Sequence, residues 1–547
     1  MQSPWGPAPP TPCRSLTPVL PSGRSGKRRA FRGRPIELGR HYLLAVALTS
    51  ALLLALGGPA GPADSPGGPG SHAVASAKIT VDPHPWGVST RYIGGTEGSA
   101  RFDIRDLTDC GINTLRIYAD MSRFEWVDDD SPAGAAEQPR SRWYGSPSIA
   151  EIKANPNIIP WRRWDRVMDS PYSPFVKAKP ELTWRRMFAQ LRRAGVCTVI
   201  SLRNRDAPTL QPAWIAAVPT TEADWNEWWE YVFAMAYWLN VRNDFRVDEY
   251  EVLNEPDNTP QQGWLGTREQ YCEMVKRTKD ALDYVYRTYL PGRAYHVHAP
   301  VTSGPAWVPG VLKEAGDYFD SLNLHNYAWW DKGECVRQVH RWLAESGHPD
   351  YPVWISEWGT LDVSYDETYM GLAVVENLIR FSQPGDDHVY GSHIFSFYDW
   401  AYDGKGSPGR ATPEGAWGVV TGEGKRRATY YALRLAIRAL AGAKPTFKAT
   451  TDAPDLMAIA TKERDGRINL LVLNWSDKVS YRITADLSGL LTNGSPGRPT
   501  AKGAATLRQF SAGVHDEVVG KPAITKGILT LTAPPWSAVV ARCGRGG

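Results

Sequence analysis

Short apolar runs that end in polar residues recur along the chain between residues 84 and 400. Runs of this length, rich in Val, Ile and aromatic residues, are typical of buried strands. We predict eight strands, over residues 84–95, 112–120, 196–206, 247–257, 294–304, 318–327, 351–359 and 388–400. Segments with the apolar spacing of amphipathic helices lie between them. These segments include residues 184–195, 225–239, 271–290, 335–347 and 369–381, and residues 429–442 follow the last strand.

The alternation of strands and helices predicts a parallel sheet with right-handed crossovers. Eight repeats over about 360 residues fit a closed (β/α)8 barrel with long loops. An open, doubly wound sheet is the competing architecture, but no GxGxxG-type turn follows any early strand. Residues 118–182 are too long for an ordinary loop, and we expect them to form one wall of a cleft.

The pattern changes after Lys444, where short alternating runs are separated by Asp, Gly, Pro and Asn. Alternation with a two-residue period is typical of strands that bury one face. We therefore predict an α/β fold class, with a (β/α)8 TIM barrel over residues 78–443. A C-terminal all-β sandwich domain follows over residues 444–547.

The first 63 residues have the composition of an export segment. Eight Lys or Arg residues against one acid precede the run LLAVALTSALLLAL at 43–56. Fourteen residues are few for a bilayer core about 30 Å thick, but they suit the apolar region of a signal peptide. We predict a signal peptide over residues 1–63, a flexible linker over 64–77, and a secreted mature chain without a stable membrane span. Tethering to a membrane by residues 43–56 is the alternative.

Charge and cysteine content narrow the function classes further. The formal net charge is +4, but residues 1–63 contribute +7, so the rest of the chain carries −3. This balance gives no electrostatic reason to expect a nucleic acid partner. The six cysteines show no CxxC pair and no metal-ligand spacing. One disulfide among the five outside the export segment is left open.

Polar residues cluster at the predicted strand ends, which meet at one face of a barrel, where active sites lie. Two of them are carboxylates that end otherwise apolar strands: Glu255 in LNEP on the fourth strand and Glu357 in ISEWG on the seventh. Either alone is more simply a solvated strand end, but two in matched settings indicate chemistry. The full set is Arg116, Asn204, Asn254, Glu255, His325, Tyr327, Glu357 and Trp400.

A pair of carboxyls that flanks one bond is what glycoside cleavage requires. One carboxyl donates its proton to the leaving oxygen, and the other, ionised, attacks the sugar. The fourth and seventh strands face each other across an eight-stranded barrel, so Glu255 and Glu357 can bracket a single bond. No metal-ligand cluster or cofactor motif accompanies them in the sequence, so we expect neither a metal nor a cofactor.

The motifs around this pair resemble those of the clan A glycoside hydrolases over about residues 80–440. The matching stretches are GINTLRIY at 111–118, LNEPD at 253–257, HNYA at 325–328, SEWG at 356–359 and FYDW at 397–400. The β-sandwich after the barrel is similar to the layout of family 39. Family 5 is the other candidate, but many of its members carry a His at the end of the third strand, where this chain has SLRNRD at 201–206.

This resemblance implies a role for each matching residue. Glu255 would be the acid/base and Glu357 the nucleophile of a retaining hydrolase. Asn254 would bind the hydroxyl next to the anomeric carbon, and Tyr327 would hydrogen-bond the nucleophile. The other implied carbohydrate-binding residues are Arg116, His325 and Trp400.

We therefore expect a secreted retaining glycoside hydrolase that acts on an oligosaccharide or polysaccharide, without a nucleic acid partner. The alternative is a non-catalytic, carbohydrate-binding cell-surface protein on the same barrel, because a fold alone does not fix function. The sequence leaves open the sugar, the linkage and exo or endo action.

Overall fold

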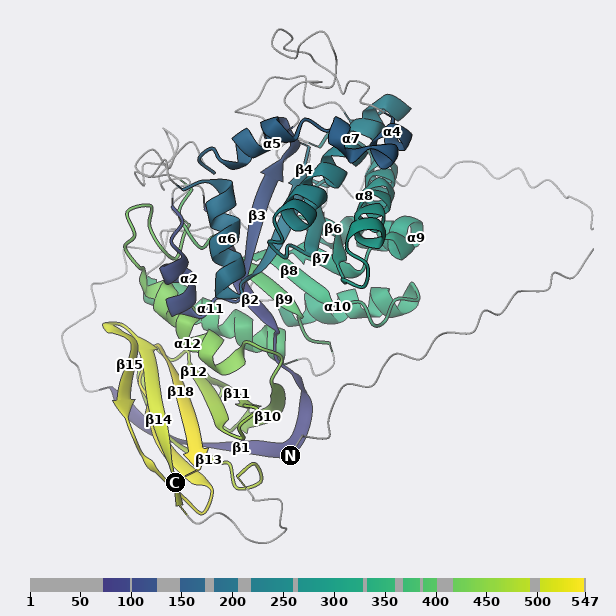
Figure 1. Ribbon diagram of the computed structural model, residues 1–547. Coiled ribbons are helices and arrows are strands. Elements are labelled where there is room, and N and C mark those ends of the chain that lie inside the picture. Colours follow the sequence, from purple (N-terminus) through teal and green to yellow (C-terminus); the bar gives the residue numbers. More distant parts are fainter. Residues whose placement is uncertain are drawn as a thin grey trace, which may run out of the picture. The chain divides into compact units, whose positions relative to one another are not determined.

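The computed structural model describes residues 72–98, 101–124, 148–172, 182–204, 218–258, 264–327, 332–359, 367–383, 387–400, 417–491 and 502–545. Eight parallel strands close into a barrel, in sequence order around the ring (Figure 1). They are β2 (Tyr92–Thr96), β3 (Thr114–Asp120), β4 (Cys197–Arg203), β5 (Glu249–Val252), β6 (His296–Thr302), β7 (Ser321–His325), β8 (Val353–Trp358) and β9 (Gly391–Ile394). Each overlaps one predicted strand, so the predicted (β/α)8 barrel is confirmed.

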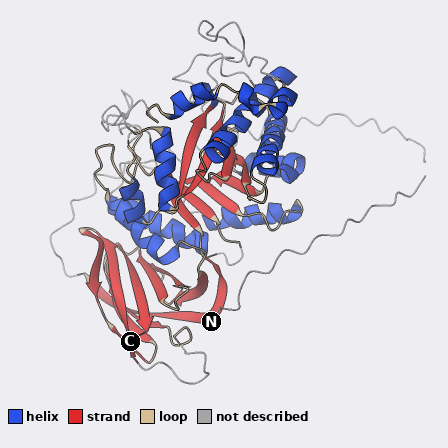
Figure 2. Cartoon of the chain, in the orientation of Figure 1, coloured by secondary structure: helices blue, strands red, loops and turns tan. Residues whose placement is uncertain are grey.

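Helices surround the barrel strands (Figure 2). The longer ones are α2 (Ile104–Cys110), α6 (Trp184–Ala194), α7 (Glu222–Ala236), α8 (Arg268–Tyr289), α9 (Val308–Ala315), α10 (Lys332–Glu345), α11 (Glu367–Ser382) and α12 (Ala428–Leu440). Local sequence sets their ends: Thr183 caps the start of α6, and Gly195, with φ of 68°, ends it in the left-handed region that favours glycine. Among the residues that the structure describes, no helix is both long and apolar enough to cross a membrane.

The long segment between β3 and α6 contains α3 (Met121–Phe124), α4 (Ile149–Ala154) and α5 (Trp161–Met168). Trp164 is fully buried and Trp161 nearly so, with rings against Phe124, Tyr231 and Tyr237. These two tryptophans belong to the hydrophobic core. The cleft wall that we expected over 118–182 falls partly outside the described residues, and so do Trp126 and Trp143.

A second, ten-stranded sheet follows the barrel, and the all-β prediction for the C-terminal region is confirmed. Its C-terminal strands are β10 (Pro445–Thr451), β11 (Leu456–Lys462), β12 (Ile468–Asn474), β13 (Val479–Asp486), β14 (Lys502–Ser511), β15 (Val514–Gly520), β16 (Ala523–Thr525), β17 (Ile528–Ala533) and β18 (Ser537–Arg545). Pairing between β14 and β18 folds the sheet back on itself. The enclosed core is separate from that of the barrel and includes Leu470, Ile483 and Val539.

The tenth strand of this sheet comes from the N-terminal side of the barrel. Strand β1 (Ala73–Val88) pairs in parallel with β13 and antiparallel with β10. Ala77, Ile79 and Val81 alternate inward, because the two-residue period of this stretch suits a sheet with one buried face. The N-terminal boundary therefore differs from our prediction, which assigned residues 64–77 to a linker and began the barrel at residue 78.

Helices α11 and α12 join the barrel to the second sheet. A Cβ at Gly371 of α11 would lie 2.3 Å from the ring of Phe510 on β14, so the helix approaches more closely than a larger residue would allow. Asp516 of β15 is fully buried at its side chain and accepts hydrogen bonds from Arg434 and Arg438 of α12 and from Arg508 of β14. We call these four residues the Asp516 cluster.

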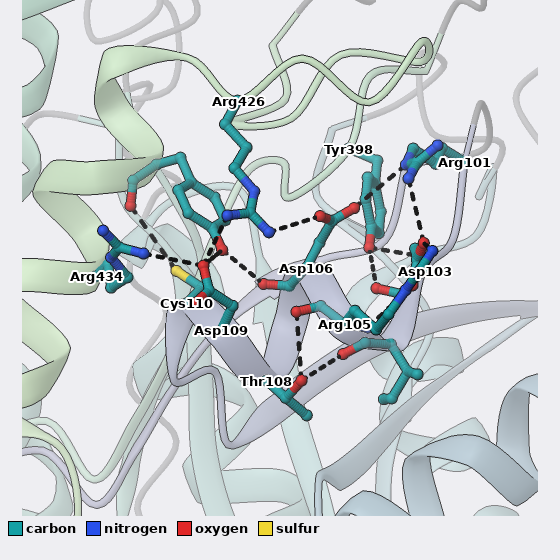
Figure 3. A network of polar contacts seen from close by, with 12 residues as sticks. Arg101, Asp103, Arg105, Asp106, Thr108, Asp109, Cys110, Tyr398, Arg426 and Arg434 are labelled. Carbon is teal, nitrogen blue, oxygen red and sulfur yellow. Dashed lines mark hydrogen bonds and ion pairs between the residues drawn. The ribbon is translucent and has the colours of Figure 1, made fainter. Parts of the chain in front are cut away.

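A second polar network connects α2 with α12 and the residues just before it (Figure 3). Arg426 pairs with Asp106 at 3.2 Å and with Asp109 at 2.7 Å. Arg434 pairs with the same Asp109 at 2.9 Å. Helices α2 and α12, which follow β2 and β9 respectively, are thus held to each other by ion pairs as well as by apolar packing.

The five cysteines that the structure describes are all free: Cys110, Cys197, Cys272, Cys335 and Cys543. The disulfide that the sequence left open is not formed among them.

Candidate active site

The two candidate carboxylates lie at the C-terminal ends of the fourth and seventh barrel strands, β5 and β8. Glu357 is the penultimate residue of β8, and Glu255 follows the end of β5 by three residues. The chain turns sharply after β5, with Leu253 at φ 62° and Glu255 at φ 45°. Non-glycine residues in this left-handed region are strained, so the surrounding contacts must hold the turn. One such contact is the Glu255 N–H, which donates to the Val301 carbonyl at 2.9 Å.

Three donors hold the Glu357 carboxylate, which is 4% exposed. Arg116 donates to Oε1 at 2.6 Å and Tyr118 to the same atom at 2.5 Å. Tyr327 donates to Oε2 at 2.6 Å. Burial raises the pKa of both tyrosines well above the ordinary value, so their hydroxyls stay protonated and donate.

The environment of Glu357 favours its ionised form. Burial alone would raise the pKa of this carboxyl. Nearby His325 and Arg116, together with the two tyrosine hydroxyls, more than offset that effect and hold the pKa below its ordinary value. Glu357 is therefore an anion at neutral pH, held in one orientation.

Glu255 has a different set of partners. His325 Nδ1 lies 2.7 Å from Glu255 Oε1, and Asn258 donates to Oε2 at 2.8 Å. The same His325 nitrogen lies 3.4 Å from Glu357 Oε2. One oxygen of each carboxyl and a nitrogen of His325 all lie within 4.8 Å of one another. The two carboxyls are thus close enough to act on a single bond.

Arg116 connects the pair to a buried acid below it. Its Nε donates to Glu251 Oε2 at 2.6 Å, and its other nitrogens reach Glu357 and Asn254. Asn323 donates to the second oxygen of Glu251 at 2.7 Å. Arg116 and Glu251 are both fully buried, and the acids raise the pKa of the guanidinium well above its ordinary value even though burial opposes this. We call Arg116, Glu251 and Glu357 the Arg116 cluster.

Trp400 lies at the edge of this group, after the end of β9. Its ring centroid is 5.6 Å from that of Tyr118, and it stacks on Phe395 at 5.9 Å. The ring thus stands beside the donors of Glu357, where an aromatic face can pack against a ligand.

Glu255, His325 and Glu357 also have the residue types and spacing of a metal site. The surroundings argue for a different use. Arg116 lies 2.6 Å from Glu357, and both oxygens of that carboxylate already accept hydrogen bonds. A fixed guanidinium at this distance repels a cation, so the arrangement favours proton and nucleophile chemistry over metal binding.

The seven residues expected to act on the substrate gather at this face of the barrel: Arg116, Asn254, Glu255, His325, Tyr327, Glu357 and Trp400. Asn204, the eighth polar residue at a predicted strand end, is buried directly after β4. Sequence reasoning missed Tyr118, Glu251, Asn323 and Asn258. A signal was available for two of them. Tyr118 stands two residues after Arg116, and Asn323 two before His325, so a strand places each pair on the same face.

No protein-family model matches the sequence, and a search of curated proteins finds no match either. Solved structures do match. A glucosidase from Croceicoccus marinus is 14% identical, covers 86% of this chain and 100% of its own, and has a TM-score of 0.57. A GH39 enzyme from Xanthomonas axonopodis pv. citri is 15% identical, with coverage of 88% and 100% and a TM-score of 0.57. An alpha-L-arabinofuranosidase from Thermotoga maritima is 15% identical, with coverage of 85% and 99% and a TM-score of 0.55.

A GH30 endoxylanase from Clostridium papyrosolvens is also among the matches, at 13% identity and a TM-score of 0.56. The structural neighbours are therefore glycoside hydrolases that include GH39 and GH30 enzymes, and the predicted resemblance to clan A is confirmed for the fold. At these identities the likeness concerns the fold, and the chemistry has to be argued from the site itself.

Proposed function

We propose that this protein is a retaining glycoside hydrolase with Glu357 as nucleophile and Glu255 as acid/base. The observation that carries the proposal is the carboxyl pair itself, with oxygens within 4.8 Å of each other. Retaining enzymes place their carboxyls about 5–5.5 Å apart, whereas inverting enzymes leave about 6.5–9.5 Å for a water. The nearest oxygens of the two carboxyls lie within 4.8 Å of each other, which is compatible with double displacement, and the stereochemistry of the product decides between the two mechanisms.

The contacts support different roles for the two acids. In the first step, the Glu357 carboxylate attacks the anomeric carbon and the bond to the leaving oxygen breaks. Glu255 gives that oxygen its proton, and a glycosyl ester of Glu357 forms. In the second step, Glu255 takes a proton from water, the water oxygen attacks the same carbon, and the ester bond breaks. The depressed pKa of Glu357 suits the group that must be ionised at the start.

The polar groups around the pair suit a sugar. The Asn254 oxygen accepts from Arg116 at 2.7 Å, and this contact orients the side-chain amide, whose N–H groups can donate to the hydroxyl next to the anomeric carbon. Trp400 offers an aromatic face to the ring. We further propose a secreted enzyme that acts on oligosaccharides or polysaccharides, based on the apolar run at 43–56 and on the glycosidase neighbours. The segment 43–56 itself lies outside the described residues.

Proton NMR of the first sugar released by the purified enzyme tests the proposal. A panel of aryl glycosides identifies a cleavable substrate, and the anomer that forms first is then recorded before it mutarotates. We expect the same anomeric configuration as in the substrate. An inverted first product would rule out Glu357 as a nucleophile, and a well-folded protein inactive on every glycoside would rule out the hydrolase itself.

A further inference from the structure

A cavity of about 480 Å³ opens beside the carboxyl pair, between the ends of β6 and β7 and the helix α10. This volume is in the range of small-molecule sites, about 300–1,000 Å³. The lining residues that matter here are Ser303, Pro305, His325, Tyr327, Gln338 and Trp342.

The cavity shares its inner wall with the candidate active site. His325 lines it and contacts Glu255, and Tyr327 lines it and donates to Glu357. The outer rim is also fixed to the active site. The Asp257 carboxylate, two residues after Glu255, accepts from the Ser303 N–H at 2.8 Å and from its hydroxyl at 3.0 Å. The turn that carries the acid and the rim of the cavity therefore form one connected unit.

The position of the cavity relative to the pair indicates which part of a substrate it holds. Arg116, Tyr118 and Asn254 stand on the β3 and β5 side, and none of the cavity's described lining residues is one of them. On the proposed function, the attacked sugar rests against Glu357 and Asn254, and the bond breaks toward Glu255. The group beyond the scissile oxygen then extends past Glu255 toward the cavity.

The walls also indicate the chemistry of that group. Trp342, Pro305 and Tyr327 line the cavity together with the amides of Gln338 and Asn326. The one carboxylate among the described lining residues, Glu334, is half-exposed and already paired with Arg337 and Arg341, which offsets its charge. An uncharged ring with an apolar face fits such a pocket, because it stacks on the aromatic surface while its hydroxyls reach the amides. A second sugar ring and an aromatic alcohol share this chemistry.

We propose that this cavity is the binding site for the leaving group and that Trp342 of α10 is its stacking platform. The inference rests on the proposed function, since the direction of bond cleavage assigns the cavity its role. It adds to that function a specificity determinant on a helix outside the barrel, 15 residues beyond Tyr327 in the sequence.

Two substrates that differ only in their leaving group test the proposal. Phenyl and trifluoroethyl glycosides of one cleavable sugar form the same glycosyl-enzyme, so kcat/KM compares only the steps in which the leaving group is still attached. We expect Trp342→Ala to lower the ratio of phenyl to trifluoroethyl kcat/KM about tenfold, a typical effect of a lost apolar contact, and Trp342→Phe to restore most of it. A ratio within twofold of wild type in Trp342→Ala would overturn the proposal.

The variant Gln338→Ala distinguishes the two candidate leaving groups, a second sugar ring and an aromatic alcohol. If the natural leaving group is a sugar, this variant loses activity on a disaccharide more than on the phenyl glycoside. If it is an aromatic alcohol, both substrates respond alike and the phenyl glycoside is the better one. A wild-type protein that cleaves none of these substrates would contradict the proposed function and, with it, the leaving-group role of the cavity, whereas ring binding in the cavity is tested separately on the unmodified chain.

A measurement on the unmodified chain covers the case in which Trp342 variants do not fold. Cys335 lines the cavity and is a half-buried residue. We expect phenol or a free monosaccharide to slow alkylation of Cys335 by iodoacetamide in the folded chain and to leave its rate unchanged in the urea-unfolded chain, as followed by peptide mass spectrometry. Equal rates with and without either compound at saturating concentration would contradict a ring-binding site.

Discussion

The molecule contains two buried clusters of arginine and carboxylate whose proportions are opposite. In the Arg116 cluster, one guanidinium forms ion pairs with two carboxylates, Glu251 and Glu357. In the Asp516 cluster, one carboxylate serves three arginines, one of them also shared with Asp109. The contacts are alike in kind and distance, yet their consequences differ.

The difference lies in what each cluster leaves available. The Arg116 cluster has more acid than base, and it lies next to a third carboxyl, Glu255, at the open end of the barrel. Its anion, Glu357, is held in place, and on the proposed function it faces the substrate. The Asp516 cluster has more base than acid, and its only carboxylate is enclosed between α12 and the second sheet. The excess negative charge of the Arg116 cluster lies at an open face, where it can take part in a reaction. The Asp516 carboxylate is enclosed and fully paired, so its effect is to stabilise the contact between the barrel and the second sheet.

Removal of the anion from the first cluster should have the largest effect. Glu357→Gln leaves no group able to attack the sugar, and we expect kcat/KM to fall on the order of 10⁴-fold or more on every substrate. Steady-state kinetics on the best aryl glycoside measures this. Asp516→Asn in the same assay should stay within about twofold, and a comparable loss there would erase the distinction between the clusters.

Removal of the anion from the second cluster should appear as lost stability. Asp516→Ala leaves three arginines facing one another, and we expect the free energy of unfolding to fall by about 3 kcal/mol, at the low end for a broken buried ion pair because the arginines are partly exposed. Urea unfolding of the mature chain measures it. Asp109→Ala is the matched control. The side chain of Asp109 is 44% exposed, so its removal should lower the free energy of unfolding by less than about 1 kcal/mol.

A smaller effect is expected from loss of one neutral donor to Glu357. Tyr327→Phe removes a hydrogen bond to an ionised group, typically about 1.5–3 kcal/mol, so kcat/KM should fall roughly 10- to 100-fold. The pKa of Glu357 should rise, since its anion loses a stabilising contact. Because the nucleophile must be ionised, the acid limb of the kcat/KM profile should move to higher pH. An unchanged limb would mean that Tyr327 acts on the substrate alone.

The smallest and most diagnostic change concerns how Arg116 is shared. Glu251→Gln removes the competing negative charge, so Arg116 acts more strongly on Glu357 and the pKa of Glu357 should fall further. The acid limb of kcat/KM should then move to lower pH, opposite to the shift in Tyr327→Phe. A limb that moved upward, or a loss of rate without any shift, would mean that Glu251 only positions Arg116.

The predictability of this molecule from sequence differed between its parts. The barrel was accessible because each strand is a compact apolar run with a polar end, and because the ends of parallel strands meet at one face. Those rules placed Glu255 and Glu357 together without any knowledge of loops. The turn at Leu253–Glu255 was predictable, because the Asn and Pro of LNEP are typical turn residues.

Contacts between strands far apart in sequence were not accessible in this way. The position of Glu251 inside the barrel depends on the direction in which a four-residue strand faces, and its partners Arg116 and Asn323 lie 135 and 72 residues away. Asp516 resembles a surface turn residue until α12 covers it. The partners of a side chain inside a core depend on how the elements pack, and the local sequence pattern does not show that packing.

The prediction for residues 73–88 was wrong for another reason. The stretch follows a Pro- and Gly-rich segment and contains Pro83 and Pro85, so its local signals favoured a linker that leads into a first barrel strand. The alternation of Ala77, Ile79 and Val81 was visible, but its partners begin at residue 445. Only the assembled sheet shows which strand it is.

Strand β1 can complete its sheet only with strands from the C-terminal region, so the second sheet cannot fold before that region has been made. On the ribosome, β1 is complete about 390 residues before β13, its parallel neighbour, begins to emerge. At about 5–20 residues per second, β1 waits roughly 20–70 s until β10, its first neighbour, begins to emerge and roughly 20–80 s until β13, its second, does so. The barrel can assemble during this interval, whereas the second sheet cannot close until synthesis is almost finished. A nascent chain stalled before β10 would therefore carry a sixteen-residue strand with both edges open, which invites pairing with other chains.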